Sequence, residues 1–121
     1  MRKVFVVEDD DLARELYCQL LDLLGYNVIG CAANGEEAIS MFRNFPVKPD
    51  LIIMDYRLPL KNGLDAMKEI LHQDGTSKVI FASADNNIKE EALKAGAMCF
   101  IEKPFNFKKL QEEMNRILAN K

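Results

Sequence analysis

The segment VFVVEDDDL, residues 4–12, joins four apolar residues to four consecutive carboxylates. The apolar half is typical of a buried strand, whereas adjacent carboxylates repel one another and oppose folding. Asp55, Ser83 and Lys103 likewise stand at or just beyond the ends of short apolar runs. Carboxylates, a hydroxyl and an ammonium are the groups that bind a hard cation and a phosphoryl group.

The composition restricts the protein class. A chain of 121 residues with 49% hydrophobic and 29% charged residues predicts one globular domain, residues 1–121. The net charge of -3 disfavours direct binding to nucleic acid or anionic membranes. No apolar run reaches the roughly 18 residues of a membrane helix. The N-terminus lacks a secretory apolar core, so we expect a cytoplasmic protein.

The three cysteines, Cys18, Cys31 and Cys99, are scattered along the chain and form no CxxC pair. With His72 as the lone histidine, they cannot complete a zinc site. We therefore expect small buried thiols in a reducing compartment.

Short apolar runs alternate with amphipathic stretches five times. Runs without internal polar alternation suit parallel strands that are buried on both faces. Five βα repeats predict a parallel sheet with right-handed crossovers and helices on both sides. The predicted strands are residues 4–7, 27–32, 51–54, 79–82 and 99–101.

The helices are predicted from apolar stripes. For the first helix the stripe predicts an inward face, with Asp11 as a suitable N-cap and Gly25 as its stop, while the role of Asp10 stays open. Asn106 is the expected N-cap of the last helix. The expected inward residues are Leu12, Leu16, Leu20, Leu23 and Leu24; Ala38, Ile39 and Phe42; Leu64, Met67, Ile70 and Leu71; Ile88, Ala92 and Ala95; Leu110, Met114, Ile117 and Leu118.

Ligands of such sheets bind beyond the carboxyl ends of the strands. If the strand order is 2-1-3-4-5, the first and third strands are neighbours about 4.8 Å apart, and Glu8, Asp9 and Asp55 crowd together. Two charges about 4–5 Å apart repel by roughly 3–4 kcal/mol at an effective dielectric of about 20, and Lys103 alone is too little compensation. The cluster predicts Mg²⁺, and this ion with Lys103 and Ser83 could clamp a phosphoryl group transferred to Asp55.

Four segments, VVEDD, LIIMDYRLPLKNG, FASAD and IEKPF, resemble in order and spacing the receiver domain of two-component response regulators. The resemblance covers the whole chain. It implies a single doubly wound, flavodoxin-like (βα)5 domain with a five-stranded parallel sheet in the order 2-1-3-4-5.

The resemblance also implies roles for single residues. Asp55 corresponds to the phosphoacceptor, which is phosphorylated by a sensor histidine kinase, a histidine phosphotransfer protein or a small phosphodonor. Glu8 and Asp9 correspond to the acid pair that holds Mg²⁺, Asp9 most directly, together with Asp55 and the backbone carbonyl of Arg57. Mn²⁺ or Ca²⁺ could substitute. Glu8 departs from the more frequent aspartate, so its longer side chain can reach the metal through water.

Further positions correspond to the phosphate-binding and switch residues. Ser83, in place of the commoner threonine, matches the switch hydroxyl, and Lys103 matches the lysine that pairs with the phosphate. The peptide bond to Pro104 is expected to be cis. Phe100 matches the aromatic switch position, where tyrosine is usual, although it also suits plain burial in the core. Residues that tune the lifetime of the acyl phosphate are expected at Arg57 and Asp85.

The predicted function is therefore a phosphorylation-controlled switch and not an enzyme, with at most self-directed phosphotransfer and autodephosphorylation. It would control a downstream protein or output domain through the surface of the fourth helix, fifth strand and fifth helix, with a phosphorylation-dependent homodimer as a further option. A degenerate receiver that serves only as an interaction module is disfavoured because every required position is filled.

Two other classes fit less well. An aspartyl-phosphate phosphohydrolase needs a second Asp two residues after the nucleophile, where this chain has Arg57. A flavodoxin-like cofactor binder needs a hydroxyl- and glycine-rich phosphate loop after the first strand, and the EDDD run repels a bare phosphate.

Overall fold

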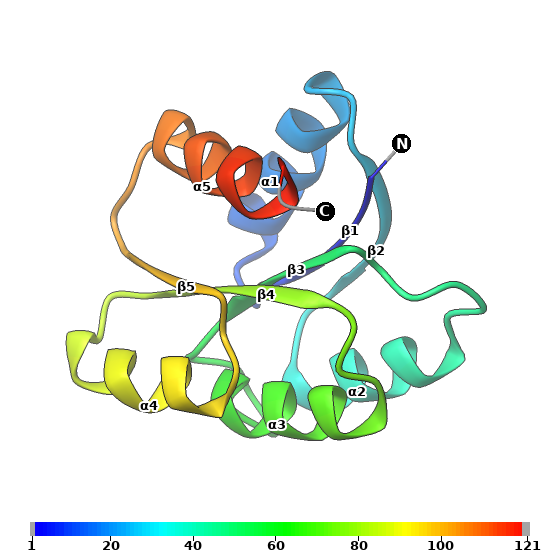
Figure 1. Ribbon diagram of the computed structural model, residues 1–121, viewed down its shortest axis with the longest axis vertical. Helices are drawn as coiled ribbons and strands as arrows, with labels where there is room; N and C mark the ends of the chain where they lie inside the picture. Colours follow the sequence, from blue (N-terminus) through cyan, green and yellow to red (C-terminus); the bar gives the residue numbers. More distant parts are fainter. Residues whose placement is uncertain (1, 120–121) are drawn as a thin grey trace.

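Figure 1 shows the computed structural model, which describes residues 2–119, as a five-stranded sheet between two layers of helices. All four strand pairs are parallel, and the spatial order is β2-β1-β3-β4-β5. Both features confirm the predicted fold. The strands are β1 (Lys3–Val7), β2 (Asn27–Ala32), β3 (Leu51–Asp55), β4 (Lys78–Ser83) and β5 (Cys99–Glu102).

The helices divide between the two faces of the sheet. α1 (Asp11–Leu23) and α5 (Phe107–Ala119) cover one face. The other face carries α2 (Gly35–Asn44), α3 (Gly63–Gln73) and α4 (Lys89–Ala95), which follows a 3₁₀ turn, η1 (Asn86–Ile88). Each face has its own hydrophobic core. None of the helices within residues 2–119 combines the length and apolar character that a membrane span requires.

Burial follows the position of each strand in the sheet. β3 is buried throughout, and β1 and β4 are buried beyond their first residues, which explains their uninterrupted apolar sequence. β2 is an edge strand whose residues are mostly only partly buried. The prediction that every strand is buried on both faces is therefore wrong for β2 and holds only in part for β5, whose alternate residues are less buried, because an edge strand has a neighbouring strand on one side only.

The inward face of α1 differs from the predicted one. Tyr17 and Leu21 are its buried residues, whereas Leu12 is 79% and Leu16 is 51% exposed. Leu23 is also exposed. Because leucines occur around most of this helix, its sequence allows more than one apolar face. Packing against α5 and β1 buries the face that contains Tyr17.

The start of α1 also differs. Asp10 is the N-cap, because its Oδ2 accepts a hydrogen bond of 2.8 Å from the N–H of Ala13. Asp11, the expected cap, is instead the first helical residue, and its carboxylate binds Arg14. At α5 the prediction is confirmed, since Asn106 Oδ1 accepts the N–H of Lys109 at 2.8 Å.

The cysteines do not all remain free thiols. Cys18 of α1 and Cys31 of β2 form a disulfide, and both side chains are partly exposed. Cys99 is the buried free cysteine. The expectation of three buried thiols is wrong for the first two, because α1 packs against the edge strand and brings together residues 13 positions apart.

The beginning of α3 lies directly against the end of β3. Gly63 donates its N–H to the carbonyl of Tyr56 at 2.8 Å, and a Cβ at this position would overlap the backbone oxygen of Asp55. Only glycine permits this close approach. The carboxyl end of β3 is thereby held in place by the helix that follows it.

We predict that Gly63→Ala lowers the free energy of unfolding by about 1–3 kcal/mol or more, because the backbone at Asp55 has to move. Gly75→Ala is the matched control, since the nearest atom to its Cβ would be 3.6 Å away, at Leu71. Urea unfolding of both variants measures the difference. Equal effects of the two substitutions would contradict the close approach.

Candidate functional site

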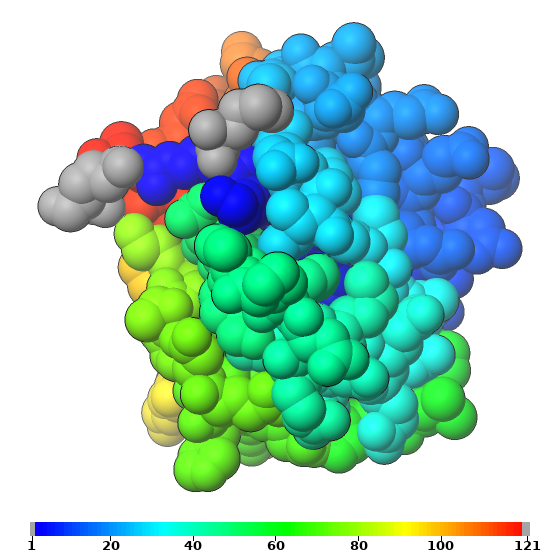
Figure 2. Space-filling view, turned by 90° about the vertical axis from the view of Figure 1, so that its right-hand side faces the viewer, coloured from blue at the N-terminus to red at the C-terminus, as the bar shows by residue number. Residues whose placement is uncertain are grey.

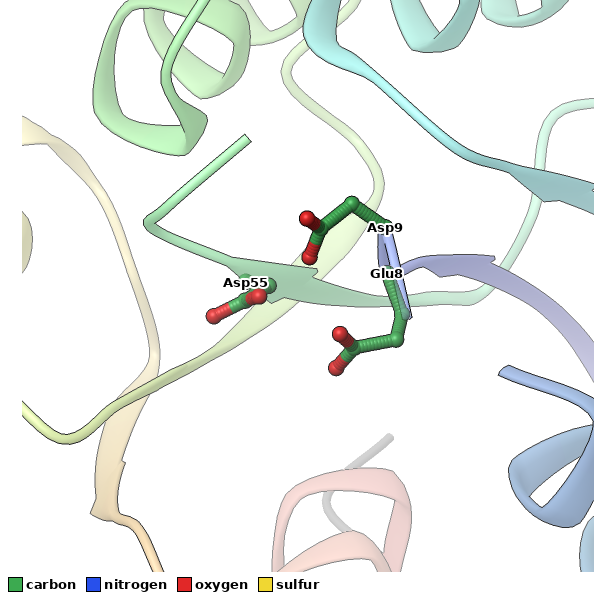
Figure 3. Close-up of side chains that lie close together, drawn as sticks. All are labelled: Glu8, Asp9 and Asp55. Atoms are coloured by element: carbon green, nitrogen blue, oxygen red, sulfur yellow. The ribbon is translucent and has the colours of Figure 1, made fainter. Parts of the chain in front are cut away.

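Three carboxylates meet at the carboxyl ends of β1 and β3, as Figure 3 shows. One oxygen each of Glu8, Asp9 and Asp55 lies within 4.8 Å of the other two. Glu8 and Asp55 are buried, with 3% and 8% of their surface exposed, whereas Asp9 is exposed. The parallel pairing of β1 with β3 produces this cluster, because it brings residues 46 positions apart to one edge.

Lys103 compensates part of this negative charge. Its Nζ lies 3.0 Å from Glu8 Oε1 and 3.2 Å from Asp55 Oδ1, so the ammonium bridges the two buried carboxylates. Its backbone N–H donates to the carbonyl of Ser83 at 2.9 Å, which fixes the chain after β5 next to β4. The peptide bond from Lys103 to Pro104 is cis, the state that the resemblance implies.

Burial and the charge of Glu8 raise the pKa of Asp55 to about 6, although Lys103 partly opposes this shift. Burial lowers the pKa of Lys103, but Asp55 and Glu8 outweigh it, and the net shift is upward. The site therefore carries more negative charge than one ammonium can neutralise. Such a set of hard oxygen ligands, with Asp9 open to solvent, fits Mg²⁺ and also Mn²⁺ or Ca²⁺.

Glu8 uses both carboxylate oxygens within the protein. Oε1 pairs with Lys103, and Oε2 accepts the N–H of Asp10 at 3.2 Å. The Asp9 side chain is exposed and extends to the opposite side of the chain from that of Glu8 (Figure 3). The geometry therefore favours Asp9 over Glu8 for direct contact with a cation.

Ser83 and Asp85 lie at the carboxyl end of β4, beside the charged cluster. Ser83 is 1% exposed, and its hydroxyl oxygen accepts the N–H of Asp85 at 2.9 Å. The Asp85 carboxylate caps η1 by accepting the N–H of Asn87 and lies 3.7 Å from the guanidinium of Arg57. This ion pair connects the loops that follow β3 and β4.

Phe100 lies on β5, outside the charged cluster. Its ring is partly buried and stacks on Phe81 of β4, with the centroids 6.2 Å apart and the planes at 18°. Phe81 stands two residues before Ser83 on the same strand. The structure thus places Phe100 against the strand that ends at Ser83, and burial in the hydrophobic core also accounts for its position.

Two residues at the site were not identified from the sequence. Arg14 donates to the carbonyl of Glu8 at 2.9 Å and to that of Asp9 at 3.4 Å. Helix α1 thereby holds the acidic loop, residues 8–10, in place. Tyr17 is buried nearby, and burial together with the charges of Glu8 and Asp55 raises its pKa. A basic residue one turn into the helix was a usable signal for Arg14. Tyr17 was missed because the predicted inward face of α1 consisted of leucines and did not include this residue.

An apolar groove of about 470 Å³ opens beside the charged cluster. It lies between α1 and the chain that leads from β5 into α5. The exposed leucine at position 16 belongs to its wall. The groove is lined by Glu8, Ala13, Leu16, Tyr17, Ala84, Lys103, Pro104, Phe105 and Phe107.

The fold and the site define a small doubly wound protein with an acidic pocket at its strand ends. Residues 4–115 match the family model of the response regulator receiver domain. The chain therefore belongs to the response regulator receiver family. A chemotaxis protein CheY from Thermotoga maritima is 37% identical over 118 residues, which cover 96% of this chain and 97% of that protein.

Solved structures agree with this assignment. The response regulator TrrA from Thermotoga maritima, described in complex with Mg²⁺ and BeF, is 31% identical with a TM-score of 0.86, covering 97% of this chain and 99% of that one. A CheX–CheY–BeF₃–Mg²⁺ complex from Borrelia burgdorferi gives a TM-score of 0.91 at 27% identity, covering 97% and 89%. Both comparisons confirm the receiver fold.

We predict that, without metal, Asp55→Asn stabilises the protein at about pH 8 and loses this advantage near pH 4. The pKa of Asp55 is raised from 3.8 to about 6 in the folded state, so the native chain binds this proton more tightly than the unfolded chain. The free energy of unfolding of the wild type thus falls as the pH rises through this window, by roughly 2 kcal/mol after allowance for screening.

Thermal unfolding in EDTA across this pH range measures the difference between wild type and variant. Asp22→Asn, an exposed position at the far end of α1, is the control and should show no such trend. A stability gap between wild type and Asp55→Asn that does not vary with pH would contradict the prediction.

Proposed function

We propose that residues 1–121 form a phosphorylation-activated switch of a two-component system, with Asp55 as the phosphoacceptor. One observation carries this proposal: the buried Asp55 carboxylate lies between a single ammonium and two further carboxylates. The raised pKa of Asp55 shows that its negative charge is unfavourable there without a further cation. Such a site favours the binding of a cation beside the Asp55 carboxylate.

In the proposed reaction an Asp55 oxygen attacks the phosphorus of a phosphohistidine. A phosphorus–oxygen bond forms while the phosphorus–nitrogen bond breaks, and the electron pair passes to the imidazole of the donor. Lys103, already 3.2 Å from Asp55, would pair with a phosphoryl oxygen. Mg²⁺, held by Asp9, Asp55 and the backbone carbonyl of Arg57, with Glu8 acting directly or through water, would offset the charge of the phosphoryl oxygens.

The donor is a sensor histidine kinase or a histidine phosphotransfer protein. The apolar groove beside Glu8 and Lys103 supports a protein donor, because it offers a contact surface next to the phosphoacceptor. Leu12 and Leu16 extend the apolar surface along α1. A small phosphodonor can use the same site without this contact. We place this exchange in the cytoplasm, in line with the expectation from sequence.

Phosphorylation would act through Ser83. Its hydroxyl now accepts the N–H of Asp85 and would turn to donate to a phosphoryl oxygen, which releases that contact. The loop into η1 and α4 then rearranges, and Phe100 changes its packing against Phe81. The surface of α4, β5 and α5 would thus signal to a downstream protein or output domain, or to a second copy of the chain.

Arg57 and Asp85 are proposed to tune the lifetime of the acyl phosphate. Their ion pair joins the two loops on one side of Asp55, where it can restrict the approach of water. The Arg57 side chain is 75% exposed and cannot serve as the acid–base group that an aspartyl-phosphate phosphohydrolase requires. We therefore favour a phosphoacceptor over an enzyme with external substrates, and over a receiver that acts only as an interaction module.

Mg²⁺ and acetyl phosphate are expected to add one labile phosphoryl group to the wild type, as measured by intact mass. Asp55→Asn should take up none, and Lys103→Met, which removes the bridging ammonium, should slow the transfer at least tenfold. Asp65→Asn is an exposed control that leaves the site intact. Stoichiometric labelling of Asp55→Asn would overturn the assignment of the phosphoacceptor.

Millimolar Mg²⁺ alone is expected to raise the melting temperature of the wild type by a few degrees, because a ligand of the native state stabilises it by mass action. The effect should be strongly reduced in Asp9→Asn, which removes the exposed carboxylate of the cluster. An unchanged shift in this variant would place the cation elsewhere.

A further inference from the structure

The disulfide between Cys18 and Cys31 is a feature that the phosphoacceptor site does not require. It joins α1 to the edge strand β2, and both cysteines line a surface hollow of about 450 Å³. Figure 2 faces this side of the molecule, with the blue surface of α1 next to the light blue and cyan surface that leads into β2. The sulfur atoms are therefore within reach of small redox reagents.

We propose that Cys18 and Cys31 form a reversible redox site that controls the cation affinity of the acid pair. The redox chemistry stands by itself, whereas its consequence for signalling rests on the proposed function. We assign the stronger cation site to the disulfide state, because the bond joins α1 to β2 and so restrains the two elements that contact the backbone of Glu8.

The chemistry requires a peroxide as oxidant and a dithiol as reductant. One thiolate attacks a peroxide oxygen, which yields a sulfenic acid and one water molecule after proton uptake. The second thiol attacks that sulfur, forming the disulfide and releasing a second water. In the reverse direction a dithiol opens the bond by two exchange steps and becomes a disulfide itself, so that both cysteines return to thiols.

A chain of contacts connects this pair to the acidic loop. Arg14 stands one helical turn before Cys18 on α1 and donates to the carbonyls of Glu8 and Asp9. From the other side, the N–H of Glu8 donates to the carbonyl of Ala32 at 3.0 Å, and Ala32 directly follows Cys31. The disulfide closes a ring that passes through the backbone of Glu8.

The bond also acts on the spacing between α1 and β2. While the bond is intact, α1 and the edge strand are covalently linked, and reduction removes this restraint. Arg14 would pass a change in the position of α1 to the carbonyls of Glu8 and Asp9.

The first measurement is the redox reaction itself. The purified chain is treated with hydrogen peroxide or with dithiothreitol, and the remaining thiols are alkylated and located by peptide mass. Oxidation should protect Cys18 and Cys31 together, leave Cys99 as a thiol and raise the melting temperature by roughly 10 °C. Free alkylation of Cys18 and Cys31 after peroxide, or failure of dithiothreitol to restore them, would overturn the proposal.

The second measurement is the dissociation constant for Mg²⁺, obtained by calorimetry in both redox states. We expect reduction to weaken binding about fivefold, at the lower end of typical coupling between sites. Cys18→Ser and Cys31→Ser should each bind Mg²⁺ with the affinity of the reduced wild type under both oxidising and reducing conditions. Cys99→Ser should keep the difference in Mg²⁺ affinity between the two states. Because both serine variants remove the same bond, the second one still tests the coupling if the first fails to fold.

A disulfide that forms while the affinity for Mg²⁺ stays equal in both states would overturn the coupling. This result differs from a failure of the proposed function. If Asp55 accepted no phosphoryl group in either redox state, the phosphoacceptor proposal would fall, while the thiol chemistry and the Mg²⁺ measurements would still decide the redox proposal.

Discussion

The ammonium of Lys103 between the carboxylates of Glu8 and Asp55 is the contact on which the site depends. It lies 3.0 and 3.2 Å from its two partners and offsets repulsion that burial makes costly. The compensation is incomplete, as the raised pKa of Asp55 shows. The domain thus folds with an excess of negative charge at this point, which a bound cation would offset.

Helix α1 connects this charged point to the rest of the molecule. Arg14 holds the carbonyls of the acidic loop, and Asp10 caps the helix. Further along the helix, Leu16 lines the apolar groove and Cys18 is linked to Cys31 on the edge strand. A donor protein in the groove and a change at the disulfide would therefore act on the same short segment that carries the acid pair.

Most of the fold was predictable because it depends on local pattern. Continuous apolar runs gave the strands to within one residue at each end, as in β3, predicted at 51–54 and observed as Leu51–Asp55. The inward face of α1 was not predictable, because its leucines allow more than one stripe and Tyr17 wins only through its packing on α5. The N-cap was shifted by one residue for a similar reason, since any of several adjacent aspartates could serve.

The sequence by itself determined which chemical groups stand at the strand ends. It therefore also determined that three carboxylates, a hydroxyl and an ammonium lie together at the carboxyl ends of the strands. Only the tertiary structure decided how they divide their contacts: both oxygens of Glu8 are engaged, Asp9 stays open to solvent, and Ser83 binds Asp85. It alone also brought Cys31 to Cys18. Such pairings depend on distances between elements, which helix packing sets and local sequence periodicity does not encode.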